Sequence, residues 1–388
     1  MGDHVYLQRV QAYRARDQEQ SAIDPSGCAG LPEHVARTET HAIADPEFTK
    51  LGRIIAASVP VTARSLGESG FRLVRSGHAA FEHRIALIEY AQRSLDLQYY
   101  IIHDGESVRV IAGHLIAAAE RGVRVRVLVD DFHTVGADAA LIRFASHPGI
   151  EVRLFNPFGG ARGSVLGRVI GGLGELRRLN RRMHNKLFIA DNAMAITGGR
   201  NLGDEYFSMA TDGELRTGRL DLESAPATLL ADRPAKAEDG ATRIDSMVLE
   251  QVADLLRSGQ TEVILVSSYF IPGATGMALV REHRTRGVSV RVLTNSLAST
   301  DAPLAHVGYA RYRLAMLEQG VKLNELGPLV DDPPPRDSVM SSGSSRASLH
   351  TKLINIDRRV LFIGSMNLDP RSAFENTEIG LVIEIVPF

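Results

Sequence analysis

Two short segments of the chain carry the same reactive side chains at the same spacing. Residues 184–191 read HNKLFIAD and residues 350–357 read HTKLINID, so both have the pattern His-x-Lys-x-x-x-x-Asp. Each is followed, after six residues, by a glycine-containing turn that ends in an asparagine, Asn201 or Asn367. An imidazole can attack phosphorus or protonate a leaving oxygen, and ammonium and amide groups can stabilise phosphoryl oxygens. A set supplied twice therefore predicts chemistry on a phosphodiester.

Lysine is scarce in this chain, and its placement supports the same interpretation. Only five of the 44 basic residues are lysines, and two of the five, Lys186 and Lys352, occupy the third position of the motifs. Lysine is a compact, mobile point charge, whereas arginine is a planar fork, so the two are not interchangeable. This selection favours a reactive site over the alternative, a pair of surface strands without chemistry.

The duplication extends beyond the two motifs. The segment ERGVRVRVL at residues 120–128 recurs as TRGVSVRVL at residues 285–293, with the glycines 165 positions apart, 122 to 287. In the first copy, alternating apolar residues at 95–99 and 123–127 enclose a stretch with helical spacing at 111–119. Strands separated by a helix in this way are typical of a parallel sheet covered by helices.

We therefore predict an α/β protein of two pseudo-symmetric α-β-α halves, with mostly parallel or mixed central sheets and the active site at their interface. The motif is expected to lie on a strand, because alternation would then place His184 and Lys186 on one face. The expected organisation is an N-terminal extension, a first repeat, a linker and a second repeat, at residues 1–79, 80–210, 211–242 and 243–388 respectively.

Composition excludes several classes of protein. The net charge of −2 gives no overall cationic field, so nucleic acid is not an expected partner. The single cysteine, Cys28, excludes an internal disulfide. Residues 26–29 resemble a lipoprotein cleavage site, although the polar residues before them disfavour lipidation. No run approaches the roughly 18 apolar residues that span a bilayer, so membrane attachment is expected to be peripheral.

Two irregular stretches directly precede the motifs. Residues 159–174 contain seven glycines, and residues 332–348 contain three consecutive prolines and six serines. Long irregular stretches beside reactive residues are usually lids or binding loops. Between the first stretch and its motif lie Arg177, Arg178, Arg181 and Arg182. These arginines are expected either to contact anionic headgroups at a membrane surface or to form a solvated helix face.

Together, these residues resemble the phospholipase D superfamily, and within it the bacterial cardiolipin synthase group, over about residues 80–210 and 243–385. Besides the motifs, the resemblance rests on GGRNLGDEY at 198–206, LTNSLASTD at 293–301 and SMNLDPRS at 365–372. It implies a phosphatidyltransferase without metal or cofactor that makes cardiolipin from phosphatidylglycerol and a second phospholipid. It also implies an anionic phospholipid substrate and a peripheral place on the bacterial cytoplasmic membrane, and leaves an accessory protein open.

The resemblance implies a phosphohistidine intermediate. We predict that His184 is the nucleophile and His350 the general acid and base, while the pseudo-symmetry leaves the reverse assignment open. The two histidines should then lie close together, because attack and protonation take place on opposite sides of one phosphorus.

The resemblance also implies roles for the other motif residues. Asp191 and Asp357 are expected to brace strands and loops, and Glu378 matches a family carboxylate that orients a motif histidine. The residues expected to contact the phosphoryl group are Lys186, Lys352, Asn201, Ser365 and Asn367.

The first repeat departs from the family pattern. Glu378 opens an apolar strand at residues 379–386, whereas the corresponding stretch 212–220 lacks such a strand and is followed by a polar, linker-like sequence. Two alternatives to the synthase therefore stay open. One is the same chemistry as hydrolysis, by a phospholipase D or a nuclease, and the other is a catalytically weakened paralogue that binds lipid or a partner.

Overall fold

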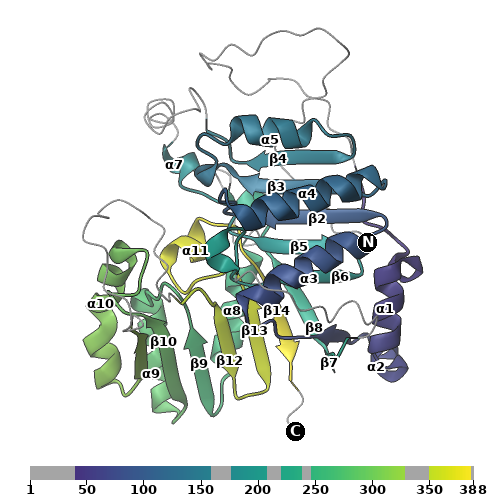
Figure 1. Ribbon diagram of the computed structural model, residues 1–388. Coiled ribbons are helices and arrows are strands. Elements are labelled where there is room, and N and C mark those ends of the chain that lie inside the picture. The colour runs from purple at the N-terminus through teal and green to yellow at the C-terminus, as the bar shows by residue number, and fades with distance from the viewer. Residues whose placement is uncertain (1–39, 159–175, 208–219, 238–245, 328–348, 386–388) are drawn as a thin grey trace. The chain divides into compact units, whose positions relative to one another are not determined.

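The structure is a computed structural model that describes residues 40–158, 176–207, 220–237, 246–327 and 349–385 (Figure 1). The chain forms two compact units, each with its own sheet and its own hydrophobic core. The expected glycine-rich and proline-serine-rich stretches at 159–174 and 332–348, and Cys28, lie outside the described residues.

The first unit has a five-stranded mixed sheet with the order β4-β3-β2-β5-β6. Strands β2, β3 and β4 are parallel neighbours, and β5 and β6 run antiparallel. The expected succession of strand, helix and strand is confirmed. The strands are β2 (Ser94–Tyr99), β3 (Arg124–Asp130), β4 (Ile150–Phe155), β5 (Lys186–Ala190) and β6 (Met194–Thr197).

Helices cover this sheet (Figure 1). In α4, Ile111, Leu115 and Ala118 recur at helical spacing and are buried in the core. The helix is followed by Gly122, whose φ of 88° suits a residue without Cβ. The helices are α3 (Gly77–Tyr90), α4 (Glu106–Glu120), α5 (Asp138–Ala145) and α7 (Leu176–Leu179).

The described part of the N-terminal extension belongs to the first unit. Leu51 and Ile54 of α1 are buried in the same core as the strands. Further along, β1 pairs with β7 in a separate two-stranded sheet. The elements of this region are α1 (Lys50–Ser58), α2 (Val61–Ser65), β1 (Ser69–Phe71) and β7 (Glu223–Ala225).

The second unit has a seven-stranded mixed sheet with the order β11-β10-β9-β12-β13-β14-β8. Its strands β9 to β12 repeat the arrangement of the first sheet, with parallel pairs β9–β10 and β10–β11 and the antiparallel pair β9–β12. The strands are β8 (Ala227–Ala231), β9 (Glu262–Val266), β10 (Ser289–Asn295), β11 (Lys322–Leu326), β12 (Leu353–Ile356), β13 (Val360–Gly364) and β14 (Ile379–Glu384). The helices are α8 (Met247–Ser258), α9 (Gly273–Thr285), α10 (Pro303–Glu318) and α11 (Pro370–Phe374). The predicted fold, two α/β halves with mixed sheets, is confirmed.

Two strands, β7 and β8, lie where the sequence indicated only a linker. Within the range 211–242, β8 pairs antiparallel with β14 and joins the second unit. Its partner is about 150 residues away in sequence, so local pattern could not reveal it. In the first unit, β6 is the edge strand of the described sheet, and no described strand takes the place that β14 has in the second unit.

The two motif strands begin later than expected. β5 starts at Lys186 and β12 at Leu353, so both motif histidines precede their strands. Placing the histidines on the strands was therefore wrong by two or three residues. In the part of the chain that the structure describes, no helix is both long enough and apolar enough to cross a bilayer.

Candidate active site

The motif aspartates brace the sheets. The carboxylate of Asp191 accepts hydrogen bonds from the backbone amides of Gln92, Arg93 and Ser94, at 2.8–3.0 Å, where β2 begins. Asp357 does the same for residues 260–262 at the start of β9, at 2.7–2.8 Å. Both aspartates have a φ of 53°, which aims the carboxylate back at the neighbouring strand.

The charge state of one of these aspartates is well defined. Burial alone would raise the pKa of Asp357, but hydrogen bonds from Glu262, Gln260 and Thr261 outweigh it and lower the pKa to about 2. The aspartate is therefore ionised at neutral pH and acts as a fixed acceptor for the strand, in agreement with the bracing role expected from the resemblance.

The motif lysines are buried. Lys186 and Lys352 are each 1% exposed, and each donates a hydrogen bond to the carbonyl oxygen of its own motif histidine, at 2.7 Å and 2.9 Å. Lys352 also donates to Ser268 Oγ at 3.1 Å. Burial lowers the pKa of Lys352 to about 7, against the opposing effect of carboxylates led by Glu378. A cation held in so dry a place is well suited to stabilising a phosphoryl charge.

The two motif histidines lie beside different neighbours. His184 is 7% exposed. Its ring packs edge-on against that of Tyr100, with 5.1 Å between the ring centroids. Tyr100 also packs edge-on against the ring of His133, with 5.0 Å between the ring centroids, so a second imidazole lies near the first motif. In the second unit, Lys352 Nζ lies 3.1 Å from Nδ1 of His350. The sequence analysis missed Tyr100 and His133, because nothing in their local pattern distinguishes them.

The two turn asparagines are buried but differ in their bonding. Asn201 accepts from the amide of Ile101 at 3.3 Å and donates to the Tyr206 hydroxyl at 3.1 Å. Asn367 is 2% exposed, and its Oδ1 has no hydrogen-bond partner among the described residues. A buried polar atom without a partner is costly unless a ligand satisfies it. Asn367 is thus the amide with bonding capacity left for a substrate.

Glu378 and Ser365 form a buried pair. Both are fully buried, and Ser365 Oγ donates to Glu378 Oε2 at 2.5 Å. The turn before Ser365 requires a glycine, since a Cβ on Gly364 would lie 2.3 Å from the carbonyl oxygen of Ile379. Ser365, expected at the phosphoryl group, is thus engaged with the carboxylate of Glu378.

A buried ion pair that the sequence analysis missed supports Glu378. Asp232 Oδ2 accepts from Lys236 Nζ at 2.7 Å and from the amide of Glu378 at 3.0 Å. Its Oδ1 accepts from the amide of Val248 at the start of α8. Burial raises the pKa of Asp232, against the lowering effect of Lys236. The scarcity of lysine could have pointed to Lys236, which stands in the range taken for a linker.

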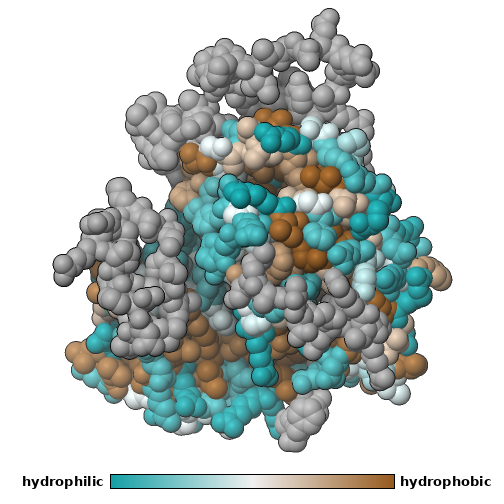
Figure 2. Space-filling model, viewed as in Figure 1, coloured by the Kyte–Doolittle hydropathy of each residue, from teal (hydrophilic) through white to brown (hydrophobic). Residues whose placement is uncertain are grey.

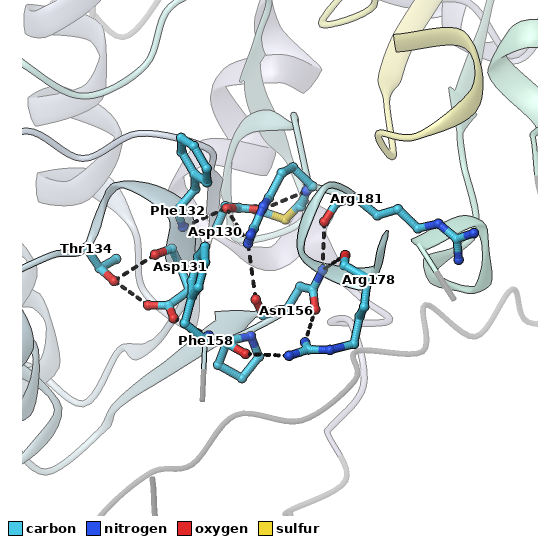
Figure 3. A network of polar contacts seen from close by, with 11 residues as sticks. Asp130, Asp131, Phe132, Thr134, Asn156, Phe158, Arg178 and Arg181 are labelled. Carbon is cyan, nitrogen blue, oxygen red and sulfur yellow. Dashed lines mark hydrogen bonds and ion pairs between the residues drawn. The ribbon is translucent and has the colours of Figure 1, made fainter. Parts of the chain in front are cut away.

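Two of the four arginines before the first motif are buried. Arg181 is 8% exposed and Arg182 0%, and Arg178 donates to the Asn156 side chain and to the carbonyl oxygen of Pro157. Figure 3 shows Asn156 between Arg178 and Arg181, whose carbonyl oxygens accept from its amide at 2.8 Å and 2.7 Å. The expectation of a solvated face is therefore wrong for Arg181 and Arg182, and contact of this cluster with an anionic headgroup stays a prediction. The side chain of Arg177 lies outside the described residues.

Within each unit, then, a histidine, a buried lysine and a turn asparagine are present, and the second unit adds Glu378. In such a set, the lysine and the asparagine can stabilise the phosphoryl oxygens of a phosphodiester, and the histidine can attack its phosphorus or protonate the leaving oxygen. No group of three or more histidine, cysteine or acidic side chains in the described ranges could hold a metal ion.

Comparisons with known proteins agree with this chemistry. The family model described as cardiolipin synthase, phospholipase D-like domain, matches residues 85–216 and 252–387. Cardiolipin synthase C of Escherichia coli (strain K12) is 35% identical, across 86% of this chain and 85% of the relative. Cardiolipin synthase B of Salmonella typhi is 25% identical, across 80% and 76%. The solved phosphatidylserine synthase of Haemophilus influenzae Rd KW20 shares the fold, with a TM-score of 0.55 at 15% identity, across 84% of this chain and 87% of that one.

Proposed function

Because the chain belongs to the cardiolipin synthase family with a phospholipase D-like domain, we propose that it is a phosphatidyltransferase. The proposed reaction transfers the phosphatidyl group of phosphatidylglycerol to a second phospholipid and forms cardiolipin. The observation that carries the proposal is the duplicated set of histidine, buried lysine and turn asparagine, in which each lysine donates to the carbonyl oxygen of its own motif histidine. The family match supports the same reaction class.

The reaction needs two displacements at one phosphorus. His184 attacks, the bond from phosphorus to the headgroup oxygen breaks, and His350 gives that oxygen a proton. His350 then takes the proton of the incoming hydroxyl, whose oxygen displaces His184. Lys186, Lys352 and Asn367 stabilise the charged phosphoryl oxygens in both steps. Glu378, held by Ser365, orients a motif histidine.

The test is expression in a host that lacks cardiolipin, followed by extraction and chromatography of its lipids. Cardiolipin supports the proposal, and its loss in a His184→Ala, His350→Ala double variant of equal abundance ties it to this site. Phosphatidic acid without cardiolipin would instead indicate hydrolysis, and unchanged lipids would indicate a weakened paralogue. A nuclease is disfavoured by the net charge of −2.

We further propose that the enzyme binds anionic membranes peripherally through α10. Four apolar residues with exposed fractions of 49–87% lie on this helix: Leu304, Val307, Leu314 and Leu317. At 3.6 residues per turn they fall within an arc of about 140°, in which the exposed Arg311 and Glu318 also lie, and Arg313 lies just beyond one edge. The opposite face packs Tyr309 and Met316 into the core. Figure 2 shows hydrophobic residues at the margin where α9 and α10 lie in Figure 1.

Exposed apolar side chains beside arginines can contact the surface of an anionic membrane. Flotation with vesicles that contain phosphatidylglycerol should therefore weaken in a Leu304→Ser, Leu314→Ser variant. A matched control is Leu66→Ser, Leu73→Ser, which alters two residues of the first unit that are 76% and 65% exposed. Unchanged flotation of the α10 variant, or conversion of a dimer to a monomer by it, would exclude α10 as the membrane contact.

A further inference from the structure

In each unit, the residue just before the motif histidine is held by a buried side chain from another strand. Asp130, the last residue of β3, is 0% exposed, and its Oδ2 accepts the N–H of Met183 at 2.8 Å. Asn295, the last residue of β10, is 2% exposed. Its Oδ1 accepts the N–H of Leu349 at 2.9 Å, and its Nδ2 donates to the Leu349 carbonyl oxygen at 3.0 Å.

The two contacts are equivalent in the internal repeat. Asp130 and Asn295 are 165 positions apart, and Met183 and Leu349 are 166 apart, which matches the offset of the repeat. β3 and β10 also occupy the same place, each next to the strand that pairs with the motif strand. The residue type differs between the two copies, a carboxylate in one and an amide in the other. In both copies, a side-chain oxygen accepts the N–H of the residue before the motif histidine.

The position of these contacts gives them a specific use. His184 and His350 precede β5 and β12, so both lie outside the ladders of these strands. The hydrogen bonds to residues 183 and 349 hold the chain one residue before each imidazole. A displacement of about 1 Å in a reacting group costs on the order of 10²-fold in rate, so a group that prevents it contributes to turnover.

We propose that Asp130 and Asn295 are positioning residues, which hold His184 and His350 respectively in reactive geometry. The proposal rests on the phosphatidyltransferase function proposed above. It adds two residues outside both motifs to the machinery, and assigns one of them to each histidine.

The two positioning residues, Asp130 and Asn295, which we call the anchors, differ in charge. Asp130 faces Arg182 across 3.5 Å and also faces Asp131. Burial raises the pKa of Asp130 to about 7, while Arg182 and the amides of Phe132 and Met183 lower it. Figure 3 shows Asp130 within this network. Asp130→Asn keeps an acceptor for Met183 but removes the negative charge that faces Arg182, so this substitution separates positioning from stability.

The experiment compares Asp130→Leu, Asp130→Asn and Asn295→Leu with an adjacent control, Asp131→Asn. Asp131 is equally buried, and its carboxylate accepts from the amide of Phe158 and the hydroxyl of Thr134. Both leucine variants should lower kcat by about 100-fold with little change in KM, because the histidine and not the lipid is displaced. Asp130→Asn should keep most of kcat while its Tm falls, and Asp131→Asn should keep kcat.

A substrate with a good leaving group separates the two anchors. A phosphatidyl ester of p-nitrophenol releases an anion that needs no proton, so the release of p-nitrophenol in the first turnover should be restored in Asn295→Leu but not in Asp130→Leu, while the second step still needs His350 as base. The opposite pattern would support both anchors and exchange the roles of the histidines. Wild-type kcat in both folded leucine variants would overturn the proposal.

A second measurement does not depend on turnover. Side-chain NMR signals of His184 and His350, assigned with His184→Gln and His350→Gln, should shift in Asp130→Leu and Asn295→Leu respectively, each variant affecting its own histidine. Absence of these shifts overturns the positioning role. Shifts in a protein that turns over no phosphodiester would keep the positioning role and reject the proposed function instead.

Discussion

At the scale of single residues, the site depends on charges held out of water. Three of the chain's five lysines, Lys186, Lys236 and Lys352, are 1% exposed. Burying an ammonium group is unfavourable unless acceptors surround it, so such residues reduce stability in return for function. Lys236 is hydrogen-bonded to a carboxylate, whereas the two motif lysines donate to carbonyl or hydroxyl oxygens.

The first prediction concerns Lys352. Its folded-state pKa of about 7 lies below the ordinary 10.5, so between these values the unfolded chain binds the proton more tightly. The free energy of unfolding should therefore rise with pH from 7 to 10 in the wild type, relative to Lys352→Met. Denaturant titrations of both proteins across this range check the prediction, and parallel curves would contradict it. Lys352→Met should also be inactive at every pH.

The second prediction concerns Asp357, whose pKa is lowered from 3.8 to about 2. A lowered carboxylate pKa stabilises the fold above the unfolded value, and this stabilisation is lost as pH falls through the folded value. Asp357→Asn should cost about 1–3 kcal/mol at pH 7, because amides at the start of β9 lose a charged acceptor. The difference between the two proteins should shrink below pH 4. A constant difference down to pH 2 would mean that the carboxylate charge is irrelevant.

At the scale of elements, the edge strand β8 holds the buried carboxylate of Glu378 in place. β8 pairs with β14, and Asp232, the residue after β8, binds both Lys236 and the amide of Glu378. One short segment therefore extends the sheet and fixes a site residue. In the first unit the described sheet ends at β6.

The third prediction follows from this ion pair. Lys236→Met should lower the free energy of unfolding by about 3–5 kcal/mol, because it leaves a buried carboxylate without its cation. The double variant Asp232→Asn, Lys236→Met should recover part of that loss, and Asp232→Asn alone completes the cycle. Additive effects of the two substitutions would show that the pair is not coupled.

At the scale of the whole molecule, each unit supplies one motif histidine. The expectation that both act on one phosphorus stays a prediction. Since the two steps differ in what they need, substitutions of the two histidines should have different results.

The fourth prediction is tested with a labelled phosphodiester. His184→Ala should prevent covalent labelling, because no nucleophile remains, whereas His350→Ala should slow turnover and still allow the intermediate to be trapped. Acid-quenched protein from single-turnover reactions shows which variant is labelled. Labelling of His184→Ala but not of His350→Ala would reverse the two roles.

The sequence by itself determined the chemistry and the class of fold. The motifs, the turns with Asn201 and Asn367, and the offset of about 165 residues are local patterns, and local patterns are readable without coordinates. The strand and helix order of the first repeat was predictable for the same reason, since apolar periodicity records which faces are buried.

Only the tertiary structure decided which side chains are partners. The pairing of β8 with β14, the burial of Arg182 against Asp130, and the hold of Asn295 on Leu349 join residues 50 or more positions apart. From sequence alone, the arginine cluster before the first motif predicted a solvated or lipid-binding surface, and the polar stretch within residues 211–242 predicted a linker. Burial and hydrogen bonding between distant segments contradict the solvated surface and the linker, because they depend on which segments meet and not on which residues are adjacent.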